Sequence, residues 1–247
     1  MPAAAVQAQA RLGFPKGIIA FDVALACSGW GYGLYLAGLL ARETDKKVLL
    51  LDGDVQSAFT GDDEATVPLL ADGGTATVVE RREEGRGKRE EGWKFGFAAD
   101  GEKGDALRLS HGEAIKMDGF GVFRFVATDV VDYIKEFLAS VNRTIEQSEQ
   151  SNNRTMTFVP HQPNAYMVRQ LAKSVGIDEA RTAISCDELG NLSSASIPVT
   201  IARKGVRGSV LFAGFGGGLS VAVGMISIDG GCKLSFDDGT IRKENRV

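Results

Sequence analysis

The chain has few cysteines and no long apolar run. Its three cysteines, Cys27, Cys186 and Cys232, are too few and too scattered for a disulfide framework or a zinc site, so we expect a reducing compartment. No apolar run reaches the ~18 residues that a membrane helix needs. The first residues lack the basic and apolar regions of a signal peptide. These absences predict a cytoplasmic protein that does not enter a membrane.

Positive charge is also not in excess. The 28 Lys and Arg residues stand against 32 Asp and Glu, which gives a net charge of −4 at pH 7 and no electrostatic case for nucleic acid or an anionic membrane. The densest charge run, residues 81–91, mixes both signs and predicts a solvated loop or hairpin edge. The acidic stretch 52–64 fits no EF-hand spacing, so we expect a solvated loop there and no metal site.

Apolar residues make up 44% of the 247-residue chain, enough for one large domain or two fused subdomains. Periodicity and turn residues divide the chain into strands and helices. The predicted strands are 19–23, 48–51, 75–80, 156–159, 184–186, 209–212 and 219–228. The predicted helices are 3–13, a glycine-rich one from residue 29, 122–141, 165–175 and one that ends at residue 201. Residues 93–119 look irregular, and residues 213–218 look like a glycine loop.

The order of these segments repeats within the chain. In residues 5–23 and again in 165–187, a helix, a glycine, a short loop and a strand lead to an aspartate. A helix start of small residues follows each, and then a strand, glycine turn and strand, at 70–79 and 212–223. The repeat predicts two similar α/β halves about a pseudo-dyad.

We place the first half at residues 1–120, with an irregular cap at about 81–120. The second half would span residues 121–247. The first half is the shorter, because it has no counterpart of the helix and strand at 122–159.

Three side chains share one kind of position. Cys27, His161 and Asn191 each follow a predicted strand and lie near the start of a helix, where α/β sheets meet their ligands. A helix N-terminus stabilises a thiolate, so Cys27 is either an activated nucleophile or a small apolar core residue, and the residues around it leave these two even. The other histidine, His111, lies in the irregular section, and we expect it at the surface.

Five motifs occur in order across most of the chain. Together they resemble those of the β-ketoacyl-acyl-carrier-protein synthase III family, within the thiolase-like superfamily. They are Ala26-Cys27-Ser28-Gly29, Asp72-Gly73-Gly74, Val159-Pro160-His161-Gln162-Pro163-Asn164, the run from Gly190-Asn191 to Ile197-Pro198, and Ala213-Gly214-Phe215-Gly216-Gly217-Gly218.

The resemblance implies an α/β thiolase-like fold with central buried helices and an incomplete first half. It implies that Cys27 accepts the acyl group, while His161 and Asn191 hold a malonyl thioester and stabilise the enolate left when carbon dioxide departs. The backbone N–H groups of Cys27 and Gly217 would form the oxyanion hole. Phe215 would lie against the malonyl carboxylate.

The resemblance also implies that Arg169 and Lys173, one helical turn apart, help to dock the acidic acyl-carrier protein. An ordinary solvated helix face is the alternative interpretation of this pair.

The implied activity is that of a transferase of fatty acid biosynthesis and lipid metabolism. An acyl primer, carried by coenzyme A or by acyl-carrier protein, would undergo decarboxylative Claisen condensation with malonyl-acyl-carrier protein. The resemblance implies no cofactor and no metal, and a cytoplasmic homodimer. Two alternatives stay open: an acyltransferase of secondary metabolism, of polyketide or quinolone type, on the same scaffold, and an inactive or truncated subunit that only supports a partner.

Overall fold

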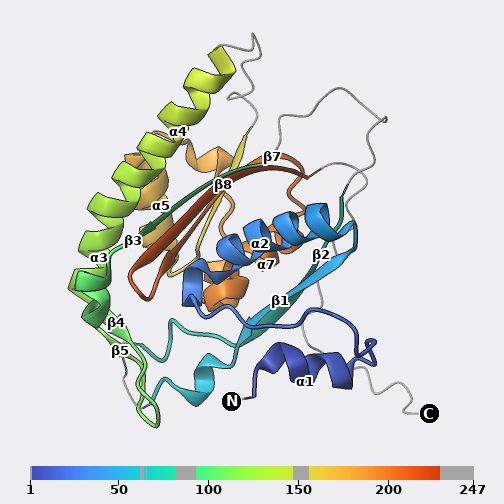
Figure 1. The fold of residues 1–247 in the computed structure, drawn as a ribbon. Helices are drawn as coiled ribbons and strands as arrows, with labels where there is room; N and C mark the ends of the chain where they lie inside the picture. Colours follow the sequence, from blue (N-terminus) through green and yellow to red (C-terminus); the bar gives the residue numbers. More distant parts are fainter. Residues whose placement is uncertain (1, 62–63, 65, 82–92, 147–155, 229–247) are drawn as a thin grey trace.

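The computed structural model describes residues 2–61, 64, 66–81, 93–146 and 156–228 (Figure 1). The helices are α1 (Ala4–Arg11), α2 (Gly29–Thr44), α3 (Gly119–Phe125), α4 (Val131–Glu146), α5 (Ala165–Ser174), α6 (Cys186–Leu189) and α7 (Ser196–Lys204). The strands are β1 (Val48–Asp54), β2 (Gly73–Val79), β3 (Lys94–Ala99), β4 (Leu107–Arg108), β5 (Lys116–Met117), β6 (Thr157–Pro160), β7 (Gly208–Gly216) and β8 (Ser220–Ile228). Short 3₁₀ helices, η1 (Ala26–Ser28) and η6 (Ser193–Ala195), directly precede α2 and α7.

A mixed sheet with the strand order β3-β8-β7-β6 forms the middle of the molecule. Strand β6 runs parallel to β7, whereas β8 is antiparallel to both of its neighbours. Helices α4 and α5 cover one face of this sheet, and α2 and α7 cover the other (Figure 1). The antiparallel pair β1–β2 contacts the far side of α2 and α7. The two central helices are therefore enclosed between two sheets.

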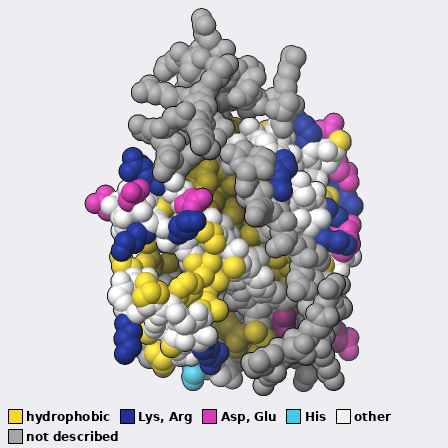
Figure 2. Space-filling model, turned by 90° about the vertical axis from the view of Figure 1, so that its right-hand side faces the viewer, with side chains coloured by type: hydrophobic (Ala, Val, Ile, Leu, Met, Phe, Trp, Pro, Cys, Tyr) yellow, Lys and Arg dark blue, Asp and Glu magenta, His cyan; other side chains and the backbone are white. Residues whose placement is uncertain are grey.

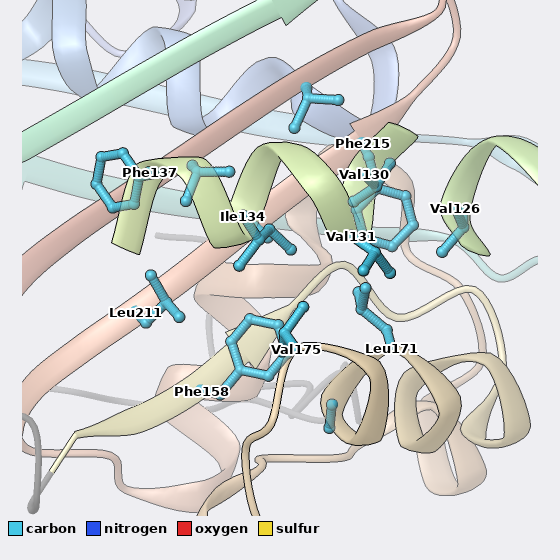
Figure 3. Packing of buried hydrophobic residues seen from close by; sticks show 14 of the residues in the cluster. Val126, Val130, Val131, Ile134, Phe137, Phe158, Leu171, Val175, Leu211 and Phe215 are labelled. Atoms are coloured by element: carbon cyan, nitrogen blue, oxygen red, sulfur yellow. The ribbon is translucent and has the colours of Figure 1, made fainter. Parts of the chain in front are cut away.

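The first hydrophobic core lies between the central sheet and the outer helices (Figure 3). Val130, Ile134, Phe137 and Val141 recur at helical spacing along α4 and the π-helical turn before it, and all are buried. They face apolar side chains of β6, β7 and α5, such as the fully buried Phe158. The helix predicted for 122–141 is confirmed, because this apolar stripe has a sheet to cover.

The second core lies between the sheet and α2. Trp30 and Leu34 are buried there, and the Trp30 ring meets the edge of Phe212 with centroids 5.1 Å apart. The glycines of α2 allow this close approach. A Cβ atom at Gly31 would lie 2.6 Å from the Ala222 Cβ, and one at Gly33 would lie 2.7 Å from Leu50.

Gly31→Ala is expected to lower the free energy of unfolding by ~1–3 kcal/mol, because the new methyl group overpacks the α2–β8 contact. Gly38→Ala, in the same helix, is the matched control: its Cβ would meet only the Trp93 ring, at 3.8 Å. Alanine there should be neutral or stabilise by up to ~1 kcal/mol through helix propensity. Urea unfolding of the three proteins measures both effects. Equal losses in the two variants would contradict the close α2–β8 contact.

The repeat is visible in the order of elements. Apart from the short 3₁₀ helix η2 (Gln56–Ala58) between β1 and β2, the unit η1–α2–β1–β2 has the same succession as η6–α7–β7–β8. The predicted α/β class with buried central helices is confirmed. The glycine turn expected within 70–79 is wrong. Strand β2 begins at Gly73, and Gly73 and Gly74 pair with Asp54 and Gly53 of β1. The division of the chain at residue 120 stays a prediction.

Two predicted strands are wrong. Residues 19–23 have no regular structure, and Ile19, Phe21 and Val23 are exposed. No strand in the described ranges pairs with them, and an apolar run without a hydrogen-bonded neighbour does not form a strand. Residues 184–186 do not extend the sheet either. The Ser185 N–H donates to the Gln162 side chain at 2.9 Å, and Cys186 already begins α6.

Three further expectations need correction. Residues 94–99, placed in the irregular section, form the edge strand β3, whose glycine and aromatic residues pair with β8. The predicted glycine loop after residue 212 is still strand as far as Gly216, because β7 pairs with β8 to that point. Asp52 and Asp54 belong to β1 and not to a solvated loop. The charge run at 82–91 and the polar tail after residue 228, with Cys232, lie outside the described residues.

Some large apolar side chains lie at the surface. Val78 and Phe120 are among them, and Figure 2 shows apolar side chains gathered between charged ones on one face. Exposed apolar residues are common on folded proteins, so they identify no binding face by themselves. Within the described ranges, no helix has both the length and the apolar character to cross a membrane.

Candidate active site

Cys27 lies in η1, at the N-terminal end of the central helix α2. The residue is half-buried, and Ala26 before it has a φ of +43°. Strand β7 passes so close that a Cβ atom at Gly216 would lie 2.7 Å from the Cys27 Cβ and 3.0 Å from its Sγ. At Gly214 a Cβ would lie 3.1 Å from the Cys27 carbonyl oxygen. Glycines in β7 therefore make room for the thiol at the head of the helix.

His161 directly follows β6 and is only 3% exposed. The backbone N–H of His161 donates to the Ala213 carbonyl at 2.7 Å, which continues the β6–β7 pairing by one residue. The imidazole meets the Phe215 ring edge-on, with centroids 5.4 Å apart. The buried Gln162 holds this strand end by donating to the carbonyls of Pro160 and Ala183. The position of His161 is thus fixed by backbone and side-chain contacts.

Asn191 follows α6, after Gly190 with a φ of +71°. Its backbone is held by the segment between β1 and β2: the Asn191 N–H donates to the Leu69 carbonyl at 2.8 Å, and the Ala71 N–H donates to the Asn191 carbonyl at 2.9 Å. The Gln56 side chain donates to the same Asn191 carbonyl. The turn that carries Asn191 is therefore anchored to the other half of the repeat.

Ser193 connects the three predicted residues. Its Oγ lies 3.7 Å from the Cys27 Sγ, and its N–H donates to the Asn191 Oδ1 at 2.9 Å. A backbone hydrogen bond of Ser193 also acts on the pKa of His161, which it raises against the effect of burial. Because the Oδ1 of Asn191 accepts the hydrogen bond from Ser193, the NH₂ group of the same amide remains to donate to another acceptor. The structure thus brings Cys27, His161 and Asn191 together around one buried serine.

Burial keeps both titratable groups of this site neutral at pH 7. Desolvation raises the pKa of the Cys27 thiol to about 11, against the opposing effect of the Ser193 hydrogen bond. Desolvation also lowers the pKa of His161 to about 3. The His161 Nδ1 is buried without a hydrogen-bond partner among the described residues. A neutral imidazole can donate one N–H to a carbonyl or an enolate, and a thiol at a helix N-terminus gains stabilisation of its anion.

Two family models match the chain. Residues 21–101 match the model described as 3-oxoacyl-[acyl-carrier-protein (ACP)] synthase III, and residues 145–228 match the model of its C terminal. A β-ketoacyl-[acyl-carrier-protein] synthase III from Neorickettsia sennetsu is 30% identical over 231 residues, which cover 90% of this chain and 70% of the relative. The chain belongs to the β-ketoacyl-acyl-carrier-protein synthase III family.

Other members of the family agree with this result. The β-ketoacyl-[acyl-carrier-protein] synthase III of Oceanobacillus iheyensis is 33% identical over 227 residues, which cover 89% of this chain and 69% of the relative. The crystal structure of 3-oxoacyl-(acyl carrier protein) synthase III from Pseudomonas aeruginosa matches with a TM-score of 0.78 at 29% identity, over 94% of this chain and 73% of that one. The resemblance found in the motifs and the thiolase-like fold are both confirmed.

The remaining predicted residues fall into two groups. Gly217 lies beside Ala26, the residue before Cys27, because its Cβ would be 3.4 Å from the Ala26 Cβ, and the buried Phe215 contacts His161. Arg169 and Lys173 lie on the exposed side of α5, where the Arg169 Nε donates to Glu179 at 2.8 Å. The catalytic, oxyanion and docking roles of all these residues stay predictions. His111 is exposed, as expected.

Sequence reasoning gave no role to Ser193, Gln56 or Asp54. Ser193 stood in a quoted motif, but three serines occur between residues 193 and 196, and nothing in the spacing distinguishes them. Gln56 stands in a stretch predicted as a solvated loop, yet its side chain is buried against the Asn191 turn. Asp54 has an electrostatic effect on Cys27, whose pKa it raises. Only the three-dimensional arrangement joins these residues to the site.

The buried carboxyl group of Asp52 makes the stability of the fold depend on pH. Burial, and then the Asp54 charge, raise the pKa of Asp52 to about 7. Its Oδ2 and the Oγ1 of its cross-strand partner Thr75 are buried without hydrogen-bond partners in the described part of the chain. An unfolded chain releases this proton near pH ~4, so between there and neutral pH the folded state holds a proton that the unfolded state has lost. The free energy of unfolding therefore falls as the pH rises through this range.

Asp52→Asn should remove this cost, because the amide is neutral at every pH. We expect the variant to gain ~2 kcal/mol of stability over the natural chain at about pH 8, and much less at about pH 4. Urea unfolding at several pH values measures the difference between the two proteins. A difference that stays constant with pH would show that Asp52 is not the titrating group.

Proposed function

We propose that this chain catalyses the condensation that opens fatty acid synthesis, in two half-reactions at Cys27. In the first, the Cys27 sulfur attacks the carbonyl of an acyl thioester. A new C–S bond forms, the bond to the donor thiol breaks, and the Cys27 proton passes by way of water to the departing thiolate. The backbone N–H groups of Cys27 and Gly217 hold the oxyanion of the tetrahedral intermediate.

In the second half-reaction, malonyl-acyl-carrier protein loses carbon dioxide and the electron pair of the broken C–C bond becomes an enolate. His161 and Asn191 donate hydrogen bonds to the enolate oxygen, while the edge of the Phe215 ring keeps water from the departing carboxylate. The enolate carbon then attacks acyl-Cys27, and the Cys27 thiolate leaves and takes up a proton. The product is a β-ketoacyl thioester on the carrier protein.

The observation that supports this mechanism best is the meeting of Cys27, His161 and Asn191 at Ser193. The charge states also suit it. The neutral His161 offers an N–H donor at pH 7 and the thiol lies at the start of α2, so nucleophile and enolate stabiliser are separate groups.

The setting of the reaction is part of the proposal. The enzyme works in the cytoplasm as a homodimer, takes its primer from acyl-CoA or acyl-acyl-carrier protein, and docks the carrier protein at Arg169 and Lys173 of α5. It uses no cofactor or metal ion. The basic side chains of α5 are exposed, which suits an acidic partner, although Arg169 first has to leave Glu179.

The test follows both half-reactions by mass spectrometry. The purified chain is incubated with acyl-CoA alone, digested and mapped; we expect one acyl group on Cys27 and none on Cys186. Malonyl-acyl-carrier protein is then added, and the acyl group should move to the carrier protein as a β-ketoacyl product with release of carbon dioxide.

Other outcomes separate the alternatives. Acylation of Cys27 followed by transfer to a nucleophile other than malonate would make the chain an acyltransferase of secondary metabolism. A well-folded chain that takes no acyl group from acyl-CoA or from acyl-acyl-carrier protein would contradict the catalytic role and leave a non-catalytic subunit.

A further inference from the structure

The hydroxyl group of Ser193 reaches the nucleophile. Its Oγ lies 3.7 Å from the Cys27 Sγ, within the reach of hydrogen bonds to the larger sulfur atom, and Ser193 is only 6% exposed. The residue has a φ of +50°, a conformation that residues other than glycine rarely adopt. Such backbone persists where surrounding contacts hold it, and it gathers at functional sites.

The backbone of Ser193 is held by the rest of the site. Its N–H donates to the Asn191 Oδ1 at 2.9 Å, and a backbone hydrogen bond of Ser193 raises the pKa of His161. These bonds fix the direction of the Cα–Cβ bond and aim the hydroxyl at Cys27. The neighbouring Ser194 is also buried, but its Cβ lies toward Gly29 of α2. In the described part of the chain, the serine hydroxyl recorded in contact with the thiol is that of Ser193.

The contact favours one charge state of Cys27. With a neutral thiol, either group can donate the hydrogen bond, whereas a thiolate can only accept it from the hydroxyl. Hydrogen bonds to an ion are about twice as strong as neutral ones, so the contact stabilises the thiolate. Burial and the Asp54 carboxylate act in the opposite direction and raise the pKa of the thiol. The hydroxyl offsets part of that cost at the reacting atom.

We propose that Ser193 is a positioning residue that holds the Cys27 thiolate through its hydroxyl while the acyl donor is attacked. The inference rests on the proposed function, since it concerns the first half-reaction. Ser193 keeps its own proton throughout. Cys27 releases its proton to water before the attack, and the departing thiolate of the donor takes up a proton from water, so the protons balance over the half-reaction. The role of Ser193 is thus to raise the share of Cys27 that is ionised and to orient its sulfur.

The decisive variant is Ser193→Gly. Glycine adopts a φ of +50° without strain and keeps the backbone hydrogen bonds to Asn191 and His161, so only the hydroxyl is lost. The rate of Cys27 alkylation by iodoacetamide is measured against pH by peptide mass spectrometry, which needs no substrate and no turnover. At about pH 8 the rate should fall about tenfold, and the profile should move to higher pH.

Two controls accompany it. Ser194→Ala removes the adjacent buried hydroxyl and should leave the Cys27 profile unchanged. Cys186, mapped in the same digest, is the internal reference for reagent and pH. The two titratable groups that act on the thiol do not account for a difference between the alkylation profiles. Burial keeps His161 neutral over the pH range of the measurement, and Asp54 is present in every variant.

An unchanged profile in Ser193→Gly would overturn the inference. So would a shift in Ser193→Ala without one in Ser193→Gly, because the effect would then come from backbone strain and not from the lost hydroxyl. The proposed function fails separately. If the natural chain takes no acyl group but Ser193→Gly still shifts the alkylation profile, the hydrogen bond stands and the condensing activity does not.

Discussion

Cys27→Ala should abolish condensation, with a loss of at least ~10⁴-fold, while malonyl decarboxylation continues. The acyl group loses its thiol acceptor, because the Cys27 Sγ lies beside β7 and the Ser193 hydroxyl, and a neutral hydroxyl is a much weaker nucleophile than a thiolate. Removal of a covalent nucleophile leaves only the contributions of binding and of the oxyanion donors. His161 and Asn191 stay in place, so malonyl-acyl-carrier protein should still lose carbon dioxide. Product and carbon dioxide are counted in the same reaction.

The matched control is Cys186→Ala. Cys186 is the other half-buried free thiol in the described part of the chain, at the start of α6, and its loss should leave both rates within about twofold of the natural chain. The alanine at residue 27 replaces one small side chain by a smaller one, so the fold should persist, as urea unfolding can show. Condensation that survives in Cys27→Ala would exclude a covalent intermediate at this residue.

The sequence pattern predicted those helices whose formation depends on residues close together in the chain. The apolar stripe from Val130 to Val141 and the glycine-rich helix at Gly29 were predicted within a few residues, because helical periodicity and chain breaks are properties of short segments. Residues 19–23 have an equally strong apolar pattern and form no strand, because a strand depends on a neighbour far away in the sequence. An apolar pattern shows that a segment could form a strand, but it does not show whether a neighbouring strand is there to pair with it.

Strand β3 was missed for the opposite reason. Its residues do not alternate between apolar and polar, and Gly96 interrupts them. The structure explains that glycine: a Cβ atom there would lie 3.0 Å from both Phe137 and the Tyr133 hydroxyl of α4. A glycine required by close helix–sheet packing looks like a turn residue when it is seen only in sequence. The pairing with β8 overrides the weak local preference.

The candidate site divides in the same way. Cys27, His161 and Asn191 could be predicted, because the motifs carry the residue types and the strand ends place them at one edge. Asp52 was predicted to be solvated because acids usually are, but the alternation of β1 turns it inward toward Thr75. Ser193 depends on a positive φ and on its tertiary contact with Cys27, 166 residues away in the sequence, which no spacing rule contains.

His161→Ala should separate the two half-reactions. We expect malonyl decarboxylation to fall by ~10²–10³-fold, the typical cost of removing one donor from a developing oxyanion, while acyl transfer from acyl-CoA to Cys27 continues. The buried imidazole is neutral because desolvation lowers its pKa to about 3. It therefore acts as an N–H donor, and the decarboxylation rate should not follow a titration of His161 between about pH 5 and pH 8.

Controls must separate this effect from lost packing, because His161 is buried against Phe215. Asn191→Ala should give the same split, since its amide is the second donor. Asn164→Ala removes the side-chain cap of α5 and costs ~1 kcal/mol of stability without touching the chemistry, so both half-reactions should persist. A His161→Ala enzyme that loses Cys27 acylation in proportion to decarboxylation would instead make His161 the base that activates the thiol. The proposed role of His161 as a hydrogen-bond donor to the enolate would then be wrong, because the loss of decarboxylation would follow from the loss of the activated Cys27 thiol.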